Sequence, residues 1–158
     1  MHANTTLIER FYTAFQQRDH ASMRACYAPA IVFSDPVFSL TGPRAGAMWH
    51  MLCESGQDLA ITFRDITADD QRGHAHWEAR YTFSASRRKV HNIIEANFVF
   101  RDGLMVEHHD VFDFWRWARM ALVPAGWALG WTPFIQQQVQ RTAQKRLERF
   151  VAAHPEYH

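Results

Sequence analysis

The sequence predicts an α+β fold in which three N-terminal helices and a curved antiparallel sheet enclose an apolar pocket, followed by a helical extension at the C-terminus. Two observations predict it. Apolar residues recur at helical spacing within residues 6–54, and they alternate with polar residues through much of residues 59–114. Helices followed by consecutive strands are typical of α+β domains. A chain of 158 residues, 47% of them hydrophobic, suits one such domain.

Three helices are predicted before the main strands. Thr6 and Glu9 have the spacing of a capping box, which predicts that the first helix opens there. Asp19 can cap a short second helix that runs to Tyr27. The third helix covers residues 43–54 and carries several large apolar side chains on one side.

Four strands are predicted next, at residues 59–64, 73–83, 90–100 and 104–114. Residues 73–83 alternate most strictly, which is a strong strand signal. An Asp-Gly pair between the last two strands favours a hairpin turn. The inward face of the last strand is expected to carry Leu104, Val106, His108, Asp110, Phe112 and Phe114.

Residues 118–158 are predicted to be a C-terminal segment distinct from the domain of residues 1–117. The segment is first rich in tryptophan and then forms an amphipathic helix over residues 133–153. The helix could dock on the domain or on a second subunit, as its single apolar stripe indicates. It could instead lie on a membrane surface together with Trp127 and Trp131, or cover the pocket as a lid.

The composition argues against several classes of function. A formal net charge of +1 provides no basic excess for binding phosphates, so a nucleic-acid partner is not expected. The sequence contains no uninterrupted apolar run of about 18 residues, so no membrane-spanning helix is expected, and surface contact by the final helix is the less favoured alternative. Cys26 and Cys53 have no CxxC spacing, and the first residues do not resemble a signal peptide. We therefore expect reduced thiols and a cytoplasmic location.

The last predicted strand carries the strongest functional signal. His108 and Asp110 fall on its apolar inward face, where a charged group is costly unless it has partners. The two residues form either a satisfied structural network or a site. A metal centre is not expected there, because His109 points to the opposite face and the third ligand would have to come from Asp35.

Asp35 is the second candidate because it precedes Pro36, which favours an extended backbone at Asp35. It is either a turn residue that accepts backbone hydrogen bonds or a carboxylate aimed into the pocket. An apolar pocket would raise its pKa and suit a general base. Tyr81 and Asn92 could hydrogen-bond a ligand oxygen. The other expected pocket residues are Tyr12, Trp49, Trp77, Phe98 and Phe112.

Several motifs resemble those of ketosteroid-isomerase-like and SnoaL-like proteins of the nuclear transport factor 2-like superfamily. The resemblance covers about residues 5–117 and is carried by Phe11-Tyr12-Thr13-Ala14-Phe15, Asp19, Tyr27-Ala28-Pro29, Phe33-Ser34-Asp35-Pro36, Phe98-Val99-Phe100-Arg101-Asp102-Gly103 and Glu107-His108-His109-Asp110-Val111-Phe112-Asp113. It implies a cone-shaped fold, a curved sheet and three helices around a deep apolar pocket.

The resemblance also implies roles for individual residues. Asp35 matches the proton-shuttling base of ketosteroid isomerases, which lies in an Asp-Pro step. The positions of their two oxyanion-hole donors hold Phe11 and Ala96 here, which argues against steroid isomerisation. Tyr12 is adjacent to the first of these positions but lies about 100° further around the helix. SnoaL-like cyclases place polar acid–base groups on the last strand, and His108 and Asp110 occupy comparable positions in this chain.

The sequence therefore predicts a pocket protein for a small apolar ligand. It would be a cofactor-independent isomerase, cyclase or hydratase that moves a proton on a carbonyl or epoxide compound, with Asp35, His108 and Asp110 as catalytic residues. The alternative is a non-catalytic ligand-binding or dimeric assembly module. In both cases a homodimer is expected through the outer sheet face, which carries Ile93, Val99, Met105 and Val111.

Overall fold

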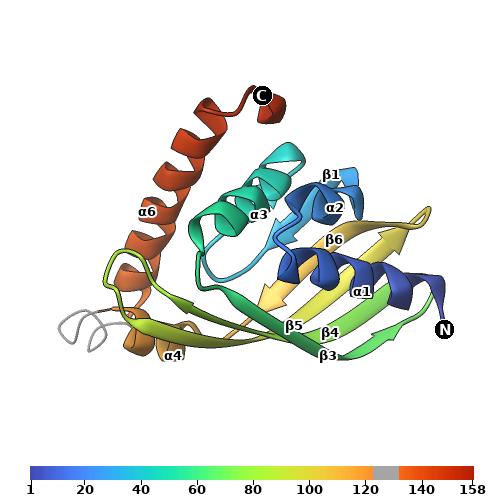
Figure 1. Ribbon diagram of the computed structural model, residues 1–158, viewed down its shortest axis with the longest axis horizontal. Coiled ribbons are helices and arrows are strands. Elements are labelled where there is room, and N and C mark those ends of the chain that lie inside the picture. Colours follow the sequence, from blue (N-terminus) through green and yellow to red (C-terminus); the bar gives the residue numbers. More distant parts are fainter. Residues whose placement is uncertain (123–131) are drawn as a thin grey trace.

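The computed structural model describes residues 1–122 and 132–158 (Figure 1). Trp127 and Trp131, considered above for membrane contact, lie outside the described residues. The helices are α1 (Ala3–Gln16), α2 (His20–Ala25), α3 (Pro43–Ser55), α4 (Phe114–Ala121), α6 (Pro133–Ala152) and the 3₁₀ helix η1 (Pro155–Tyr157). The strands are β1 (Tyr27–Ser34), β2 (Ser39–Thr41), β3 (Ala60–Ala68), β4 (Arg72–Thr82), β5 (Lys89–Arg101) and β6 (Leu104–Val111).

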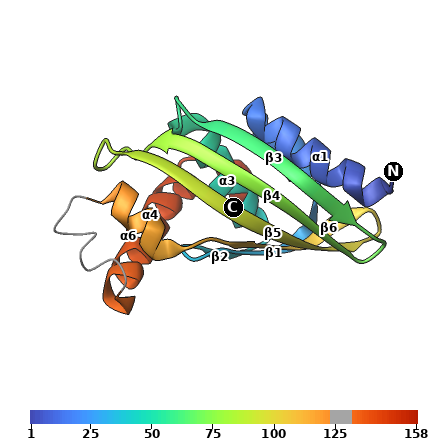
Figure 2. The ribbon, with the colours of Figure 1, turned by 90° about the horizontal axis from the view of Figure 1, so that it is seen from below.

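The strands form one curved sheet in the order β2-β1-β6-β5-β4-β3. Strands β3 to β6 pair antiparallel, as the predicted meander requires. Strand β1 pairs with β6 in parallel, so the sheet is mixed rather than antiparallel throughout. Helices α1, α2 and α3 lie on one side of the sheet (Figures 1 and 2). This arrangement confirms the predicted α+β class with three N-terminal helices.

Two helix boundaries differ from the prediction. Helix α1 begins at Ala3 rather than near Thr6, because the Nδ1 atom of His2 accepts the backbone N–H of Asn4 at 3.0 Å and caps the helix. The predicted capping box at Thr6 is therefore wrong. Helix α2 is capped by Asp19 as expected, but it ends at Ala25 because the chain then enters β1.

Strand β6 differs from the prediction at both ends. Its register against β5 shifts between Val99 and Phe100, so an extra residue of β6 is accommodated by a β-bulge. Met105 is consequently fully buried and Val106 is not, which reverses the predicted inward face at this end. The prediction that Met105 lies on the outer face is wrong for the same reason.

The other end of β6 is shorter than predicted. The strand ends at Val111, and Phe114 begins helix α4 instead of continuing the strand. The Asp113 side chain accepts the backbone N–H of Arg116 at 3.0 Å and satisfies one of the free donors at the helix start. Phe114 and Trp117 then pack with Val90 in a small second core.

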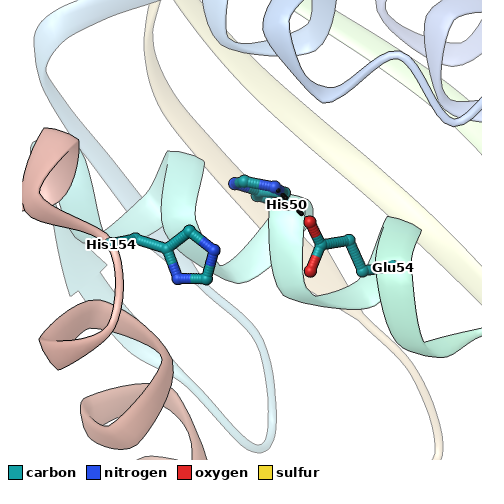
Figure 3. A group of neighbouring side chains, drawn as sticks. All are labelled: His50, Glu54 and His154. Atoms are coloured by element: carbon teal, nitrogen blue, oxygen red, sulfur yellow. Dashed lines mark hydrogen bonds and ion pairs between the residues drawn. The ribbon is translucent and has the colours of Figure 1, made fainter.

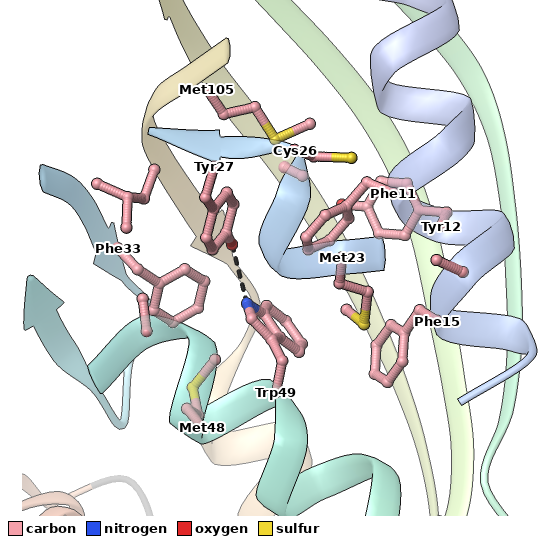
Figure 4. Close-up of a cluster of buried hydrophobic side chains, with 14 of the residues drawn as sticks. Phe11, Tyr12, Phe15, Met23, Cys26, Tyr27, Phe33, Met48, Trp49 and Met105 are labelled. Atoms are coloured by element: carbon pink, nitrogen blue, oxygen red, sulfur yellow. Dashed lines mark hydrogen bonds between the residues drawn. The ribbon is translucent and has the colours of Figure 1, made fainter. Parts of the chain in front are cut away.

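The main core lies between the first three helices and the sheet (Figure 4). Its largest members are aromatic: Phe11, Tyr12 and Phe33 are fully buried, and Trp49 is 2% exposed. Each such side chain contributes about 1.5–3 kcal/mol through burial, before the loss of conformational entropy is counted. This aromatic cluster surrounds the inner face of β6.

Helix α6 packs along α3, as Figure 1 shows. Leu147 and Val151 of α6 are buried there, and Tyr157 of η1 is buried beside them. At the other end of the helix, the side-chain amides of Gln136 and Gln140 donate to the Pro36 carbonyl at 2.9 and 3.0 Å. Among residues 1–122 and 132–158, no helix is both long and apolar enough to span a bilayer.

Candidate functional site

The pleat of β6 points His108 and Asp110 into the core, as their spacing predicts. His108 lies opposite Phe98 of β5 and Phe33 of β1, because β6 is flanked by these two strands. The His108 side chain is fully buried and the Asp110 side chain is 3% exposed. His109 points to the other face, where its Nδ1 contacts the Ser34 hydroxyl at 2.6 Å.

A chain of hydrogen bonds connects four elements through these two residues. The indole of Trp49 on α3 donates to the Tyr27 hydroxyl of β1 at 2.8 Å. The same hydroxyl lies 2.7 Å from His108 Nδ1, and His108 Nε2 lies 2.9 Å from Asp110 Oδ1. The indole of Trp77 on β4 donates to the same Oδ1 at 3.3 Å. We call these five residues the buried chain.

The direction of these bonds follows from chemistry. An indole N–H can only donate, so Tyr27 must accept from Trp49. The Tyr27 O–H then finds its acceptor in His108 Nδ1, so the His108 proton lies on Nε2 and points to Asp110. Asp110 is the carboxylate that accepts from both His108 and Trp77. Every polar hydrogen of the buried chain thus has an acceptor, and the donors converge on one oxygen.

Asp35 lies in the turn after β1 and is half-buried. Its Oδ1 accepts the backbone N–H groups of Val37 at 2.7 Å and Phe38 at 2.6 Å. Burial raises the pKa of the Asp35 carboxyl to about 6, against the opposing effect of the Phe38 N–H, and the charge of Asp110 adds to the rise. Asp35 is therefore a turn residue that accepts backbone hydrogen bonds, with a raised carboxyl pKa, and its orientation into a pocket stays a prediction.

Tyr12 is an exception to the rule that buried polar groups are paired. Its hydroxyl is fully buried and has no hydrogen-bond partner among the described residues. The ring packs against Phe63 and Trp77, with centroid distances of 5.6 and 5.7 Å. Burial, followed by the charge of Asp110, raises the pKa of the Tyr12 hydroxyl, so it remains a donor.

The other predicted ligand contacts divide into two groups. Trp49, Trp77 and Phe98 are core residues with almost no exposed surface. Tyr81, which is less buried, accepts a hydrogen bond from the Trp117 indole at 2.8 Å. Asn92 is buried on β5, opposite Ala79 of β4, and Phe112 is half-buried just beyond the end of β6.

A surface cavity of about 690 Å³ lies between helices α3 and α6, and another of about 490 Å³ lies along α6 alone. Neither is lined by Asp35, His108 or Asp110. The apolar pocket expected beside these residues therefore stays a prediction.

Sequence reasoning missed Tyr27, which links β1 to the buried chain. The sequence places Tyr27 at the end of the second helix, whereas in the structure it shares the buried face of β1 with Ile31 and Phe33. The signal that could have revealed it is this spacing. It was obscured because the register between β1 and β6 shifts between Tyr27 and Val32.

Comparison with known proteins identifies a shared sequence family and fold. A sequence model described as SnoaL-like domain matches residues 8–108. No curated protein matches the chain. Among solved structures, a protein of unknown function with the nuclear transport factor 2-like fold, from Burkholderia pseudomallei, is 17% identical with a TM-score of 0.66, covering 78% of this chain and 100% of that one.

Two further similar structures carry names that refer to chemistry. A candidate polyketide cyclase from Xanthomonas campestris is 21% identical with a TM-score of 0.63, covering 75% of this chain and 96% of that one. An epoxide hydrolase of the LEH-like type from M. tuberculosis is 17% identical with a TM-score of 0.59, covering 74% of this chain and 87% of that one. At these identities the likeness shows the fold alone.

Proposed function

The chain belongs to the SnoaL-like family of the nuclear transport factor 2-like superfamily, and from this premise we propose that it is a cofactor-independent enzyme of acid/base chemistry. Its substrate would be a small apolar carbonyl or epoxide compound, and the reaction an isomerisation, a cyclisation or a hydration. The observation that carries the proposal is a half-buried Asp35 whose pKa is raised to about 6 by burial, with a further rise from the charge of the buried Asp110, which His108 and Trp77 hold in place.

Asp35 would be the proton-transferring group. A general base works best when its pKa lies near the operating pH, and a pKa of about 6 satisfies this condition. Both backbone donors bind Oδ1, which leaves Oδ2 to take the substrate proton. With a ketone, the α C–H bond would break, the proton would pass to Asp35, and the electron pair would move to the carbonyl oxygen.

The developing oxyanion would need a donor that is already in place. Tyr12 offers a buried O–H without a partner among the described residues, and Tyr81 offers an O–H because it already accepts from Trp117. Asp110 would act through its charge, since that charge raises the pKa of Asp35. His108 would position Asp110, because it binds the same oxygen as Trp77 does.

The test is proton exchange on a panel of cyclic ketones in D₂O, read by mass spectrometry, with hydration of cyclic epoxides to diols as a second assay. Asp35→Asn should lower the rate about 10²–10⁴-fold on any compound that the wild type turns over. Asp113→Asn is the matched control, because Asn caps a helix as well as Asp does. Equal rates in wild type, Asp35→Asn and Asp110→Asn would overturn the proposal.

Non-catalytic binding or assembly is a second candidate, because the aromatic residues around β6 are so completely buried. Tyr12 is 0% exposed, and Trp49 and Phe98 are 2% exposed. The outer sheet face would then carry a homodimer interface, with Ile93 and Val111 exposed by 39% and 59%. Sedimentation velocity tests this: Ile93→Lys should convert a dimer to a monomer, and a wild-type protein that sediments as a monomer would exclude the interface.

A further inference from the structure

A second cluster of chemically active side chains lies away from the sheet, where α3 meets the end of α6 (Figure 3). His50 and Glu54 are one turn apart on α3, and His154 follows the last turn of α6. One ligand atom from each residue lies within 4.8 Å of the other two. Residues distant in sequence thus present two imidazoles and a carboxylate to one point.

His154 is held in the tautomer that can bind a metal ion through Nε2. Its Nδ1 lies 2.7 Å from the backbone carbonyl of Phe150, which can only accept. The proton must therefore be on Nδ1, which leaves the Nε2 lone pair free. Metal-binding histidines almost always donate their second ring N–H in this way, which fixes both the tautomer and the orientation of the ring.

His50 is held more firmly still. It is 6% exposed, and its ring stacks on His20 at a centroid distance of 3.5 Å and an interplanar angle of 11°. Its Nδ1 lies 2.8 Å from the Tyr157 hydroxyl, and its Nε2 lies 2.8 Å from Glu54 Oε1. Without a metal, the contact with Glu54 requires a proton on Nε2; because a hydroxyl can also accept, Tyr157 can take the Nδ1–H instead once an ion displaces that proton.

We propose that His50, Glu54 and His154 form a binding site for a divalent transition metal, best suited to Zn²⁺. Two imidazole nitrogens and one carboxylate match the preferences of zinc, whereas Mg²⁺ and Ca²⁺ select oxygen ligands. The ion would take the place of the proton between His50 Nε2 and Glu54. This site is separate from the buried chain, so it does not depend on the proposed acid/base function.

The geometry requires only a small movement. Zinc bonds of about 2.0–2.1 Å in a tetrahedral site place neighbouring ligand atoms roughly 3.3 Å apart. The Glu54 side chain is 57% exposed, so it can rotate to widen its 2.8 Å contact with His50 Nε2 and admit the ion, while the 8% exposed side chain of His50 stays in place. His154 follows the end of α6, and its half-buried ring stacks on Phe150 at a centroid distance of 3.9 Å.

The site would be open at its fourth position. Glu54 also lines the groove of about 690 Å³, together with Arg146, Arg149 and Phe150. A zinc ion with three protein ligands keeps its fourth position for water, unlike a closed structural site. The ion would also join α3 to the end of α6, so binding would stabilise the contact between the domain and its extension.

The first test is the binding of Zn²⁺ to untagged protein after EDTA treatment and dialysis. Isothermal titration should give one ion per chain, with no binding of Mg²⁺ or Ca²⁺. His154→Gln should weaken Zn²⁺ binding at least about 10-fold, since changes even to supporting groups of a metal site cost about 10–100-fold. Co²⁺ in place of Zn²⁺ should give the strong visible bands of four-coordinate cobalt, and His154→Gln should abolish them.

Two control variants keep the result interpretable. His158→Gln removes a nearby histidine whose Nε2 contacts the Val151 carbonyl, and it should bind Zn²⁺ like the wild type. His76→Gln removes a histidine from the other His/Glu cluster, on the sheet, and should also bind normally. Thermal unfolding in EDTA checks that each variant folds. Unchanged affinity in folded His154→Gln, or loss of binding in His76→Gln, would overturn the proposal.

Discussion

Two buried tyrosines show that the contribution of a hydroxyl group to stability depends on whether it has a hydrogen-bond partner. The hydroxyl of Tyr27 lies in the buried chain between Trp49 and His108, with distances of 2.8 and 2.7 Å. The hydroxyl of Tyr12 is just as buried but has no partner among the described residues. The same chemical change at the two positions should therefore have different effects.

We predict that Tyr27→Phe lowers the free energy of unfolding by about 2–3 kcal/mol, because it leaves both Trp49 Nε1 and His108 Nδ1 unpaired. Tyr12→Phe should be neutral or stabilising by up to about 1 kcal/mol, since it removes an unpaired buried group. Urea unfolding of both variants measures the difference. Equal destabilisation would mean that the Tyr12 hydroxyl has a partner. A loss of turnover in stable Tyr12→Phe would support its role as a donor.

Asp35 links stability to pH with a definite sign. Its pKa rises from 3.8 to about 6 on folding, so the folded state holds a proton that the unfolded state releases. The free energy of unfolding therefore falls as pH rises from 3.8 to about 6, and it stays lowered by the full amount at higher pH. A site that keeps a base ready at neutral pH thus lowers the stability of the protein.

Asp35→Asn should accordingly raise the free energy of unfolding by about 1–3 kcal/mol at pH 7.5, because one pKa unit corresponds to about 1.36 kcal/mol and the group is half-buried. The Asn oxygen can still accept from Val37 and Phe38. At pH 3.5 the variant and the wild type should be equally stable. Urea unfolding at the two pH values checks this, and a gain that is the same at both would show that Asp35 is not the titrating group.

At the scale of elements, the outer face of strands β4 and β5 carries a ladder of histidines and glutamates. His76 contacts Glu95 at 2.6 Å and Glu78 at 2.8 Å, and His91 contacts Glu78 at 2.6 Å. Hydrogen bonds to Glu78 and Glu95 raise the pKa of His76. The His76 and His91 contacts lower the pKa of Glu78 to about 2.

The ladder should stabilise the protein most between about pH 4.5 and 6.5. The His76 contribution is present below 6.5 and is lost as pH rises through the raised pKa. The Glu78 contribution is lost as pH falls from 4.5 towards about 2. His76→Gln should therefore lower Tm more at pH 5.5 than at pH 8.5. His74→Gln, whose ring is 38% exposed and contacts Glu95 alone in the ladder, should have a smaller effect.

The elements show where sequence patterns succeed and where they fail. Alternation over residues 73–83 correctly predicted the strand and the inward position of Trp77, because an uninterrupted strand keeps its parity. It failed at Met105, because a bulge inserts one residue and reverses the parity beyond it. The capping box at Thr6 is wrong because the His2 imidazole provides an acceptor for the Asn4 N–H four residues earlier, where the helix begins.

At the scale of the whole molecule, the C-terminal helix is part of the packing although it lies outside the matched family segment of residues 8–108. Leu147 is fully buried against the domain, whereas Phe134, near the start of the same helix, is 64% exposed. The family pattern ends before this contact, so the resemblance predicted nothing about it. Only the apolar stripe of the helix indicated that it docks.

Leu147→Ala should lower the free energy of unfolding by about 2–5 kcal/mol, because it creates a cavity between α3 and α6. Phe134→Ala should change it by less than about 0.5 kcal/mol, because an exposed side chain loses little by truncation. Chemical denaturation of the two variants gives the comparison. Similar small effects in both would mean that α6 does not stabilise the domain.

The residues of one candidate site could be predicted to lie together from the sequence, and those of the other could not. His108 and Asp110 could be predicted because polar residues on an apolar strand face are visible in one short segment. The cluster of His50, Glu54 and His154 was not predicted, since two of its residues lie in a helix and the third near the end of the chain. Periodicity places residues within one element, but it does not say which elements meet.

The parallel pairing of β1 with β6 has a consequence for how the protein is made. Phe33 pairs with His108, so these central strands meet only after nearly the whole domain has left the ribosome. Until then β1 and β5 each expose an edge that β6 will later fill, and such edges favour aggregation. Contacts this distant in sequence also slow folding. The Tyr27–His108 contact should therefore form late, and a nascent chain that has not yet synthesised β6 is the species most in need of a chaperone.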